Sequence, residues 1–318
     1  MDNDIVLVLR AMVRGAYDLQ QLRMQSGLRL CANFRAKLKA QGADTEDEDD
    51  AEEAEKKKES AIKLIKAEYR RLTDGITSEK GKVAMKKLDL TGSPLISSAA
   101  EFALVDSYIA LERQEAKQFR DLTGTLEEIP IYRDYLVNVT GIGPAMAGVL
   151  VAYLDPKRAR HVSSFWKYGG LDVANGSGRS RREEHLVERE YLDKNGETKT
   201  RLGVTYNPFL KTKLMGVLGP SFLRSGSEWR NVYDGYKNRI LSDPSRIKIT
   251  VNEWKKLHKK GEVDLKTYWT PGRIHTASTR YMVKQFLQEL WVQWRTLEGL
   301  TITLPYAEEK LGNRPHAA

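Results

Sequence analysis

The chain has little of what several classes of site require. Its single cysteine, Cys31, excludes internal disulfides and thiolate metal clusters. The five histidines are scattered without the spacing of metal ligands, and neither a phosphate-binding loop nor a dinucleotide fingerprint is present. We therefore expect no metal site in this chain and no evident cofactor.

Long apolar segments are also missing. No apolar run approaches about 18 residues, the length that indicates a membrane-spanning helix, and the first residues do not have the pattern of a signal peptide. These features predict a cytoplasmic protein with no membrane partner.

Positive charge, by contrast, is plentiful. The 318 residues include 52 Lys and Arg against 43 Asp and Glu, which gives a formal net charge of +9. This excess favours a polyanionic partner, although a basic surface that only confers solubility has the same composition. Hydrophobic residues make up 41% of the chain, which is enough for a sizeable core.

The hydrophobic pattern predicts a mainly α protein with two regions, 1–125 and 126–318. In the first region apolar residues recur at helical spacing, as in Ile62, Ile65 and Tyr69, which predicts a helical bundle or a hairpin of long helices. An acidic linker, 42–59, interrupts this pattern. Like charges repel one another, so we expect the acidic residues from 44 to 59 to be solvated and mobile.

The second region begins with a short glycine motif. Gly141-Ile142-Gly143-Pro144, followed by Ala147, has the form of a helix-hairpin-helix. Glycines at 141 and 143 permit a tight turn with exposed backbone N–H groups, and a helix that starts at Pro144 directs its positive end toward a phosphate. Such contacts recognise the nucleic-acid backbone rather than its bases. An ordinary glycine-rich turn between two helices would give the same pattern.

A basic segment follows this motif. Between 156 and 182 only Asp172 opposes a set of cations, which we predict to bind DNA together with Gly141 and Gly143. The cations are Lys157, Arg158, Arg160, Lys167, Arg179, Arg181 and Arg182. Farther along, Asn195-Gly196 lies between two alternating runs and predicts a small β-hairpin insertion within 185–205.

The rest of the chain is expected to be helical. Helices resume at Pro208, and the last one spans about 275–298. Polar positions of that helix are His275, Arg280 and Lys284. Trp229, Tyr233 and Tyr236 have a spacing that fits either core packing or base stacking.

Ser177 is the candidate catalytic residue. It lies between Gly176 and Gly178, close to Arg179 and Arg181. A serine nucleophile needs exposure, an adaptable backbone and cations that stabilise charge on a phosphate, and this segment supplies all three. The alternative is a flexible surface loop without chemistry.

Four segments together resemble the C-terminal transposase domain of the Piv/MooV-type insertion-sequence transposases, the insertion-sequence one-ten family that is guided by a bridge RNA. The segments are Gly141–Pro144, Trp166–Leu171, Ser177–Gly178 and Trp229–Lys237. The resemblance covers about a third of the chain. It implies that Ser177 forms a covalent phosphoserine link to DNA, and it extends the expected partners to a structured guide RNA.

One part of the family pattern is missing. Members carry an N-terminal RNase H-like domain with four metal-binding acids, the DEDD set, whereas residues 1–125 have a helical pattern. Magnesium would be expected only if a partner supplied that domain. We expect a homo-oligomer.

The sequence therefore predicts a transposase-like or recombinase-like DNA-binding protein that uses Ser177 in transposition or site-specific recombination. A non-catalytic helix-hairpin-helix protein that binds DNA or structured RNA is the alternative. A helical scaffold that docks an acidic protein is a third interpretation.

Overall fold

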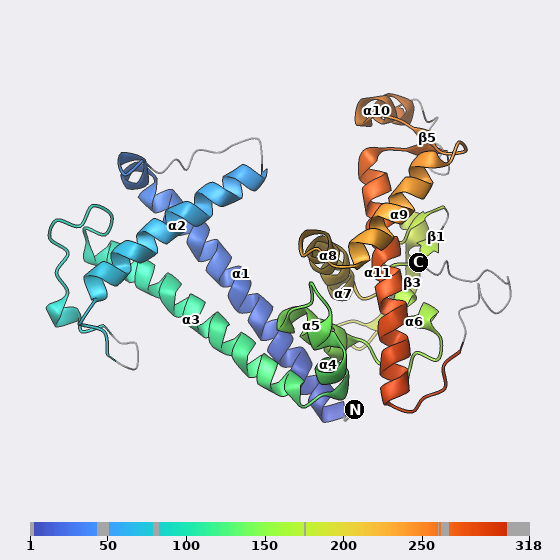
Figure 1. The fold of residues 1–318 in the computed structure, drawn as a ribbon, viewed down its shortest axis with the longest axis horizontal. Coiled ribbons are helices and arrows are strands. Elements are labelled where there is room, and N and C mark those ends of the chain that lie inside the picture. Colours follow the sequence, from blue (N-terminus) through green and yellow to red (C-terminus); the bar gives the residue numbers. More distant parts are fainter. Residues whose placement is uncertain are drawn as a thin grey trace. The chain divides into compact units, whose positions relative to one another are not determined.

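The computed structural model describes residues 3–42, 51–78, 83–174, 176–259, 261 and 267–303. It is mainly helical, as the sequence predicts (Figure 1). The chain divides into two compact units: one is formed by Ala11–Asp121, and the other by the chain from Leu122 onward together with the first ten residues. Among the described residues, no helix combines the length and the apolarity needed to cross a membrane.

The unit Ala11–Asp121 is built on three long helices and a short 3-10 helix. They are α1 (Asn3–Ala40), α2 (Ala51–Thr73), η1 (Met85–Lys87) and α3 (Ala99–Glu127). Helices α1 and α3 are antiparallel, because Lys37 pairs with Glu101 at 2.6 Å while the Gln118 amide donates to the Met12 carbonyl at 3.4 Å. The core is formed by Leu30, Phe34, Leu38, Ala61, Ile65, Tyr69, Phe102, Val105, Tyr108 and other apolar residues of this unit.

The acidic linker is only partly as predicted. Residues 51–59 belong to helix α2, so the expectation of a mobile segment is wrong for this part. Two features favour the helix: the acids lie in its first turns, where the helix dipole stabilises negative charge, and buried Ala61 and Ile65 anchor the turns that follow. Residues 43–50 lie outside the described part of the chain.

The second unit is assembled around its last helix, α11 (Pro271–Leu297), which packs against α4, α6, α8 and α9 (Figure 1). The Thr270 hydroxyl caps α11 by accepting from the backbone N–H of Arg273 at 3.3 Å. The other helices of this unit are α4 (Pro130–Asp134), η2 (Leu136–Asn138), α5 (Pro144–Tyr153), α6 (Val162–Tyr168), η3 (Glu183–His185), α7 (Pro208–Lys213), the π-helix η4 (Leu214–Leu218), α8 (Gly219–Arg224), α9 (Trp229–Ser242) and α10 (Val251–Lys259).

Three short strand pairs complete this unit. Strands β3 (Val187–Leu192) and β4 (Thr198–Gly203) form the antiparallel hairpin that Asn195-Gly196 predicts, with Gly196 at φ +79°. Strands β1 (Val173–Ala174) and β2 (Ser177–Gly178) form a second, shorter hairpin. Strands β5 (Ile247–Lys248) and β6 (Tyr268–Trp269) pair in parallel just before α11.

Candidate functional site

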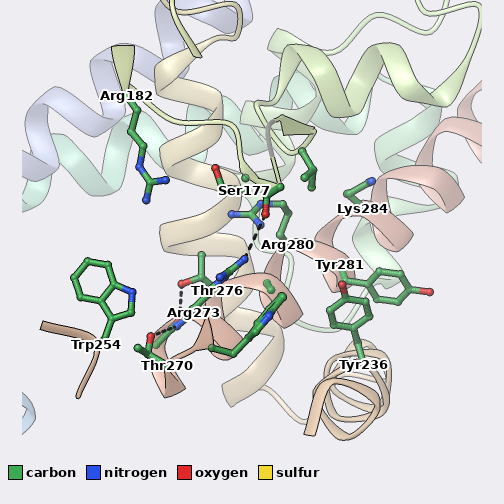
Figure 2. A pocket seen from close by; sticks show the side chains of 16 residues that line it. Ser177, Arg182, Tyr236, Trp254, Thr270, Arg273, Thr276, Arg280, Tyr281 and Lys284 are labelled. Carbon is green, nitrogen blue, oxygen red and sulfur yellow. Dashed lines mark hydrogen bonds between the residues drawn. The ribbon is translucent and has the colours of Figure 1, made fainter. Parts of the chain in front are cut away.

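Ser177 lies in a short β-hairpin instead of the flexible loop that its two glycine neighbours suggest. It pairs with Ala174 across β1 and β2, and Gly176 occupies the turn at φ +75°. This positive φ favours glycine, so the hairpin fixes the backbone on the N-terminal side of Ser177. Arg273 of α11 donates to the Gly176 carbonyl at 3.3 Å and so ties the hairpin to that helix (Figure 2).

Ser177 and Gly178 line a pocket of about 500 Å³ between the β1–β2 hairpin and α11 (Figure 2). Four cationic side chains line the same pocket: Arg182, Arg273, Arg280 and Lys284. Four aromatic side chains do so as well: Tyr236, Trp254, Trp269 and Tyr281. None of the described lining residues is Asp or Glu, so the pocket has the charge of an anion-binding site.

Arg280 is the central cation of this pocket. Its guanidinium occupies the space where a side chain at Gly178 would begin, because a Cβ built there would lie 2.1 Å from the Arg280 Cζ. Glycine at 178 is therefore what allows the guanidinium to lie beside Ser177. The Arg280 Nε is buried and has no hydrogen-bond partner among the described residues. Burial lowers the pKa of Arg280, although Tyr236 and Asp172 oppose this shift.

A buried cation without a hydrogen-bonded counter-ion is costly to the free protein. A phosphate in the pocket would supply the negative charge that balances the buried Arg280 guanidinium. The charge of the pocket is therefore suited to an anion next to the Ser177 hydroxyl.

Two lysines near Arg280 also have a lowered pKa. Burial and the charge of Arg280 lower the pKa of Lys284, whose Nζ lies 4.2 Å from the centroid of the Trp166 ring. Burial, with Arg280 and Arg179 nearby, lowers the pKa of Lys211 to about 8, against the opposing effect of Asp172. The Asp172 carboxylate forms an ion pair with Arg179, at 2.8 Å.

The depressed pKa of Lys211 predicts how stability depends on pH. The folded protein releases this proton near pH 8, whereas an unfolded lysine keeps it until about pH 10.4. The stability of the wild type should therefore rise relative to that of Lys211→Met between pH 8 and pH 10. Urea unfolding of both proteins across this range measures the difference, and parallel pH profiles would contradict the assigned environment of Lys211.

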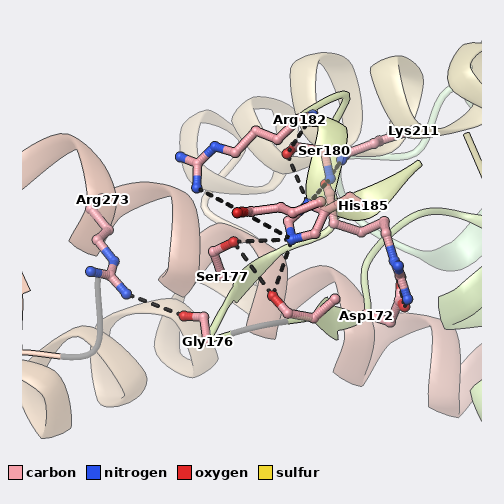
Figure 3. A network of polar contacts seen from close by, with 11 residues as sticks. Asp172, Gly176, Ser177, Ser180, Arg182, His185, Lys211 and Arg273 are labelled. Atoms are coloured by element: carbon pink, nitrogen blue, oxygen red, sulfur yellow. Dashed lines mark hydrogen bonds and ion pairs between the residues drawn. The ribbon is translucent and has the colours of Figure 1, made fainter. Parts of the chain in front are cut away.

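The His185 ring lies beside the Ser177 hydroxyl (Figure 3). Its ring is fully buried, and its Nδ1 accepts the backbone N–H of Ser180 at 3.1 Å. In the neutral ring the proton is then on Nε2, which lies 3.2 Å from the Ala174 carbonyl and 3.4 Å from the Ser177 Oγ. In this tautomer His185 donates toward Ser177, so it positions the hydroxyl and does not remove its proton.

The cations predicted from the sequence are divided among different places. Arg182 lines the Ser177 pocket, whereas the Arg179 guanidinium is engaged by Asp172 and Arg181 is exposed. Lys157 and Arg158 line a separate pocket of about 560 Å³. Arg160 and Lys167 are exposed on the surface of the same unit.

The predicted glycine hairpin precedes α5, whose first residue is Pro144. Gly141 has φ +95°, and a Cβ there would lie 2.7 Å from the Ser225 Oγ, so this glycine is needed by the fold itself. Gly143 differs, because it has φ −92° and nothing described lies within 4 Å of a Cβ built on it. The fold itself therefore does not require glycine at 143.

Gly143→Val separates the two interpretations of this turn. We expect the variant to fold with a loss of at most about 1 kcal/mol, since valine is only a poorer N-cap. If backbone N–H groups here contact phosphate, its affinity should fall by about tenfold for all DNA sequences alike. Circular dichroism and fluorescence anisotropy provide the two measurements, and normal affinity in the folded variant would show that the glycine serves only the turn.

The sequence analysis did not assign Arg273, Arg280 and Lys284 to the site. These residues lie on α11 with spacings of seven and four, which places them on one face of the helix. The signal available in the sequence was the spacing of these cations, which places all three on one face of the predicted helix. Of the three predicted aromatic candidates, Trp229 and Tyr233 are buried, while Tyr236 lines the pocket.

The chemistry of the pocket suits an anion rather than a metal ion. Among the described residues, no group of three or more His, Cys, Asp and Glu side chains is arranged to hold a metal.

Comparison with known proteins found no protein-family model, no curated protein and no solved structure that matches this chain.

Proposed function

We propose that the pocket around Ser177 binds a phosphodiester of DNA, and that Ser177 is the nucleophile of a transposase-like or recombinase-like strand-transfer reaction. The observation that carries this proposal is the position of the Arg280 guanidinium, which lies against Gly178 beside Ser177 in a pocket that three other cationic side chains also line. Charge-assisted hydrogen bonds from such a group to phosphate oxygens are among the strongest that proteins make.

In the proposed reaction the Ser177 Oγ attacks phosphorus. A bond from Oγ to phosphorus forms, one strand bond from phosphorus to oxygen breaks, and the departing oxygen leaves as a hydroxyl with the proton that the serine gives up. Arg280, Arg273 and Arg182 would stabilise the charge that builds up on the non-bridging oxygens. One bond from phosphorus to oxygen forms for each one that breaks. The phosphoserine bond can therefore be reversed, or its phosphate can be transferred to a second DNA strand.

The resemblance to the Piv/MooV-type transposases supports the nucleophile. The Ser177–Gly178 dipeptide matches the Ser-Gly dipeptide that carries the nucleophile in that family. In this fold both residues line the cationic pocket. The structured guide RNA that the resemblance implies and the expected homo-oligomer remain part of the proposal, and magnesium belongs to it only if a partner supplies the DEDD acids.

A non-catalytic DNA-binding protein or structured-RNA-binding protein is the second candidate. The observation that favours it is the tautomer of His185, because a ring that donates from Nε2 is unable to act as the base for Ser177. Both candidates require the pocket to bind a phosphate backbone, and they differ only in whether Ser177 reacts.

The common part of the proposal is tested by the salt dependence of DNA binding. Affinity for duplex and branched DNA should fall steeply between about 50 mM and about 200 mM salt, because bound cations release counter-ions. Arg280→Met should weaken binding by about 10-fold to 100-fold and reduce the slope of log affinity against log salt by about one.

The matched control is Arg120→Met, which removes an exposed arginine from α3 in the other unit. It should leave both the affinity and the salt slope close to those of the wild type. Equal losses in the two variants would mean that net charge, and not this pocket, determines binding.

A further inference from the structure

The Ser177 pocket is lined by two chemically different kinds of group. Cations and the serine hydroxyl are one kind, and aromatic rings that flank them are the other: Trp254 lies on one side of Arg273 and Arg280, and Tyr236 and Tyr281 lie on the opposite side (Figure 2). A phosphodiester requires only the first. Proteins that bind single-stranded nucleic acid combine a cationic groove for the phosphates with aromatic rings on which the bases stack.

Trp254 is the ring best placed for this role. It comes from α10, lines the pocket and is only partly buried. Its ring stacks on His258 with the centroids 4.7 Å apart and an interplanar angle of 12°, which supports it from the side of its own helix. The other rings of the pocket are already engaged: Arg273 covers Trp269 at 4.1 Å, and Tyr236 stacks on Tyr281 at 4.2 Å.

The size of the pocket fits one nucleotide. Its volume of about 500 Å³ falls within the range of sites that enclose a single small organic molecule. In an intact duplex both faces of each base are covered by neighbours, so a base can reach Trp254 only if it leaves the stack or is already unpaired.

The remaining polar groups do not favour any one base. Among the described lining residues there is no Asn, Gln, Asp or Glu, the side chains that read adenine and cytosine, and the cationic side chains are assigned here to the phosphate. The two threonines are already used, since Thr276 donates to the Gly272 carbonyl at 2.8 Å and Thr270 caps α11. Recognition by stacking alone tolerates every base.

We propose that this pocket takes an unpaired nucleotide, whose base stacks on Trp254 while its phosphate lies between Arg280 and Ser177, without regard to base identity. This inference rests on the proposed function and narrows its substrate to a strand that is single-stranded or locally opened at the reacting phosphate.

The test compares a single-stranded oligonucleotide with a hairpin duplex of the same charge by fluorescence anisotropy. The wild type should bind the single strand at least about tenfold more tightly. Trp254→Ala should weaken single-strand binding by about 5-fold to 100-fold with little effect on the duplex, and Trp254→Phe should restore most of it. A 2-aminopurine base in the strand should lose fluorescence on binding to the wild type and not to Trp254→Ala.

The control is Tyr191→Ala, which removes a ring that is 38% exposed on β3 and does not line the pocket. This variant should bind like the wild type. If the duplex binds as tightly as the single strand and Trp254→Ala changes nothing, while Arg280→Met weakens both, the pocket binds phosphate without a base and the inference is wrong. If neither nucleic acid binds, the proposed function itself fails.

Discussion

Ser177→Ala should abolish a covalent protein–DNA adduct while it leaves DNA affinity within about threefold of the wild type. Among the described residues the hydroxyl makes only long contacts, at 3.5 Å to the Ala174 carbonyl and 3.4 Å to the His185 Nε2, so its loss should not disturb the hairpin. With wild-type protein, labelled DNA should remain attached on a denaturing gel, and the peptide that contains Ser177 should carry the mass of the linked nucleotide.

Ser180→Ala is the matched control for this experiment. The Ser180 hydroxyl also contacts His185, at 3.0 Å from its Nδ1, but Ser180 does not line the pocket. The adduct should therefore form in Ser180→Ala. An adduct that survives in Ser177→Ala would assign the nucleophile to another residue, and a wild type that binds opened DNA without forming any adduct would favour the non-catalytic candidate.

The second large effect is expected from Gly178→Ala. The added Cβ would lie 2.1 Å from the Arg280 Cζ and 2.1 Å from one of its terminal nitrogens, so the guanidinium must leave its position beside Ser177. Losing its charge-assisted hydrogen bonds to phosphate should weaken DNA binding by about 10-fold to 100-fold. A single methyl group should thus have an effect as large as the removal of the arginine.

Gly235→Ala controls for the general effect of replacing glycine. Gly235 lies in α9 with nothing described within 4 Å of a built Cβ, so this change should be neutral or stabilise the helix by up to about 1 kcal/mol. In the double variant Gly178→Ala with Arg280→Met the two losses should not add, since both act on one group. Full additivity, or normal binding by Gly178→Ala, would contradict the role given to Arg280.

Much of the helical architecture could be predicted because it depends on local periodicity. Ile65 and Phe102, which belong to predicted apolar stripes, are buried in the core of the first unit. The β3–β4 hairpin followed from Asn195-Gly196 in the same way. The same Asn-Gly dipeptide occurs at 175–176, just before Ser177, and it also indicates a hairpin. The flanking strands β1 and β2 have two residues each, too few to show an alternation of apolar and polar residues.

The site was less accessible to prediction because its parts are distant in sequence. Ser177 and Arg280 are brought together only by the packing of the β1–β2 hairpin on α11, and no local pattern encodes that contact. Counting nearby charges led instead to Arg179, whose guanidinium is held by Asp172, and to Lys157 and Arg158, which border another pocket. Residue type and proximity in sequence identified the nucleophile candidate but not its principal partner.

Hydrogen–deuterium exchange of the wild-type chain with and without opened DNA tests the central claim most directly. The account predicts new protection in two segments, 173–182 and 270–284, which carry Ser177 and the cations of α11. The same protection should be lost in Arg280→Met at equal DNA concentration. Protection confined to 153–168, around Lys157 and Arg158, with none near Ser177 would contradict the account, because DNA would then bind to this unit without using the pocket.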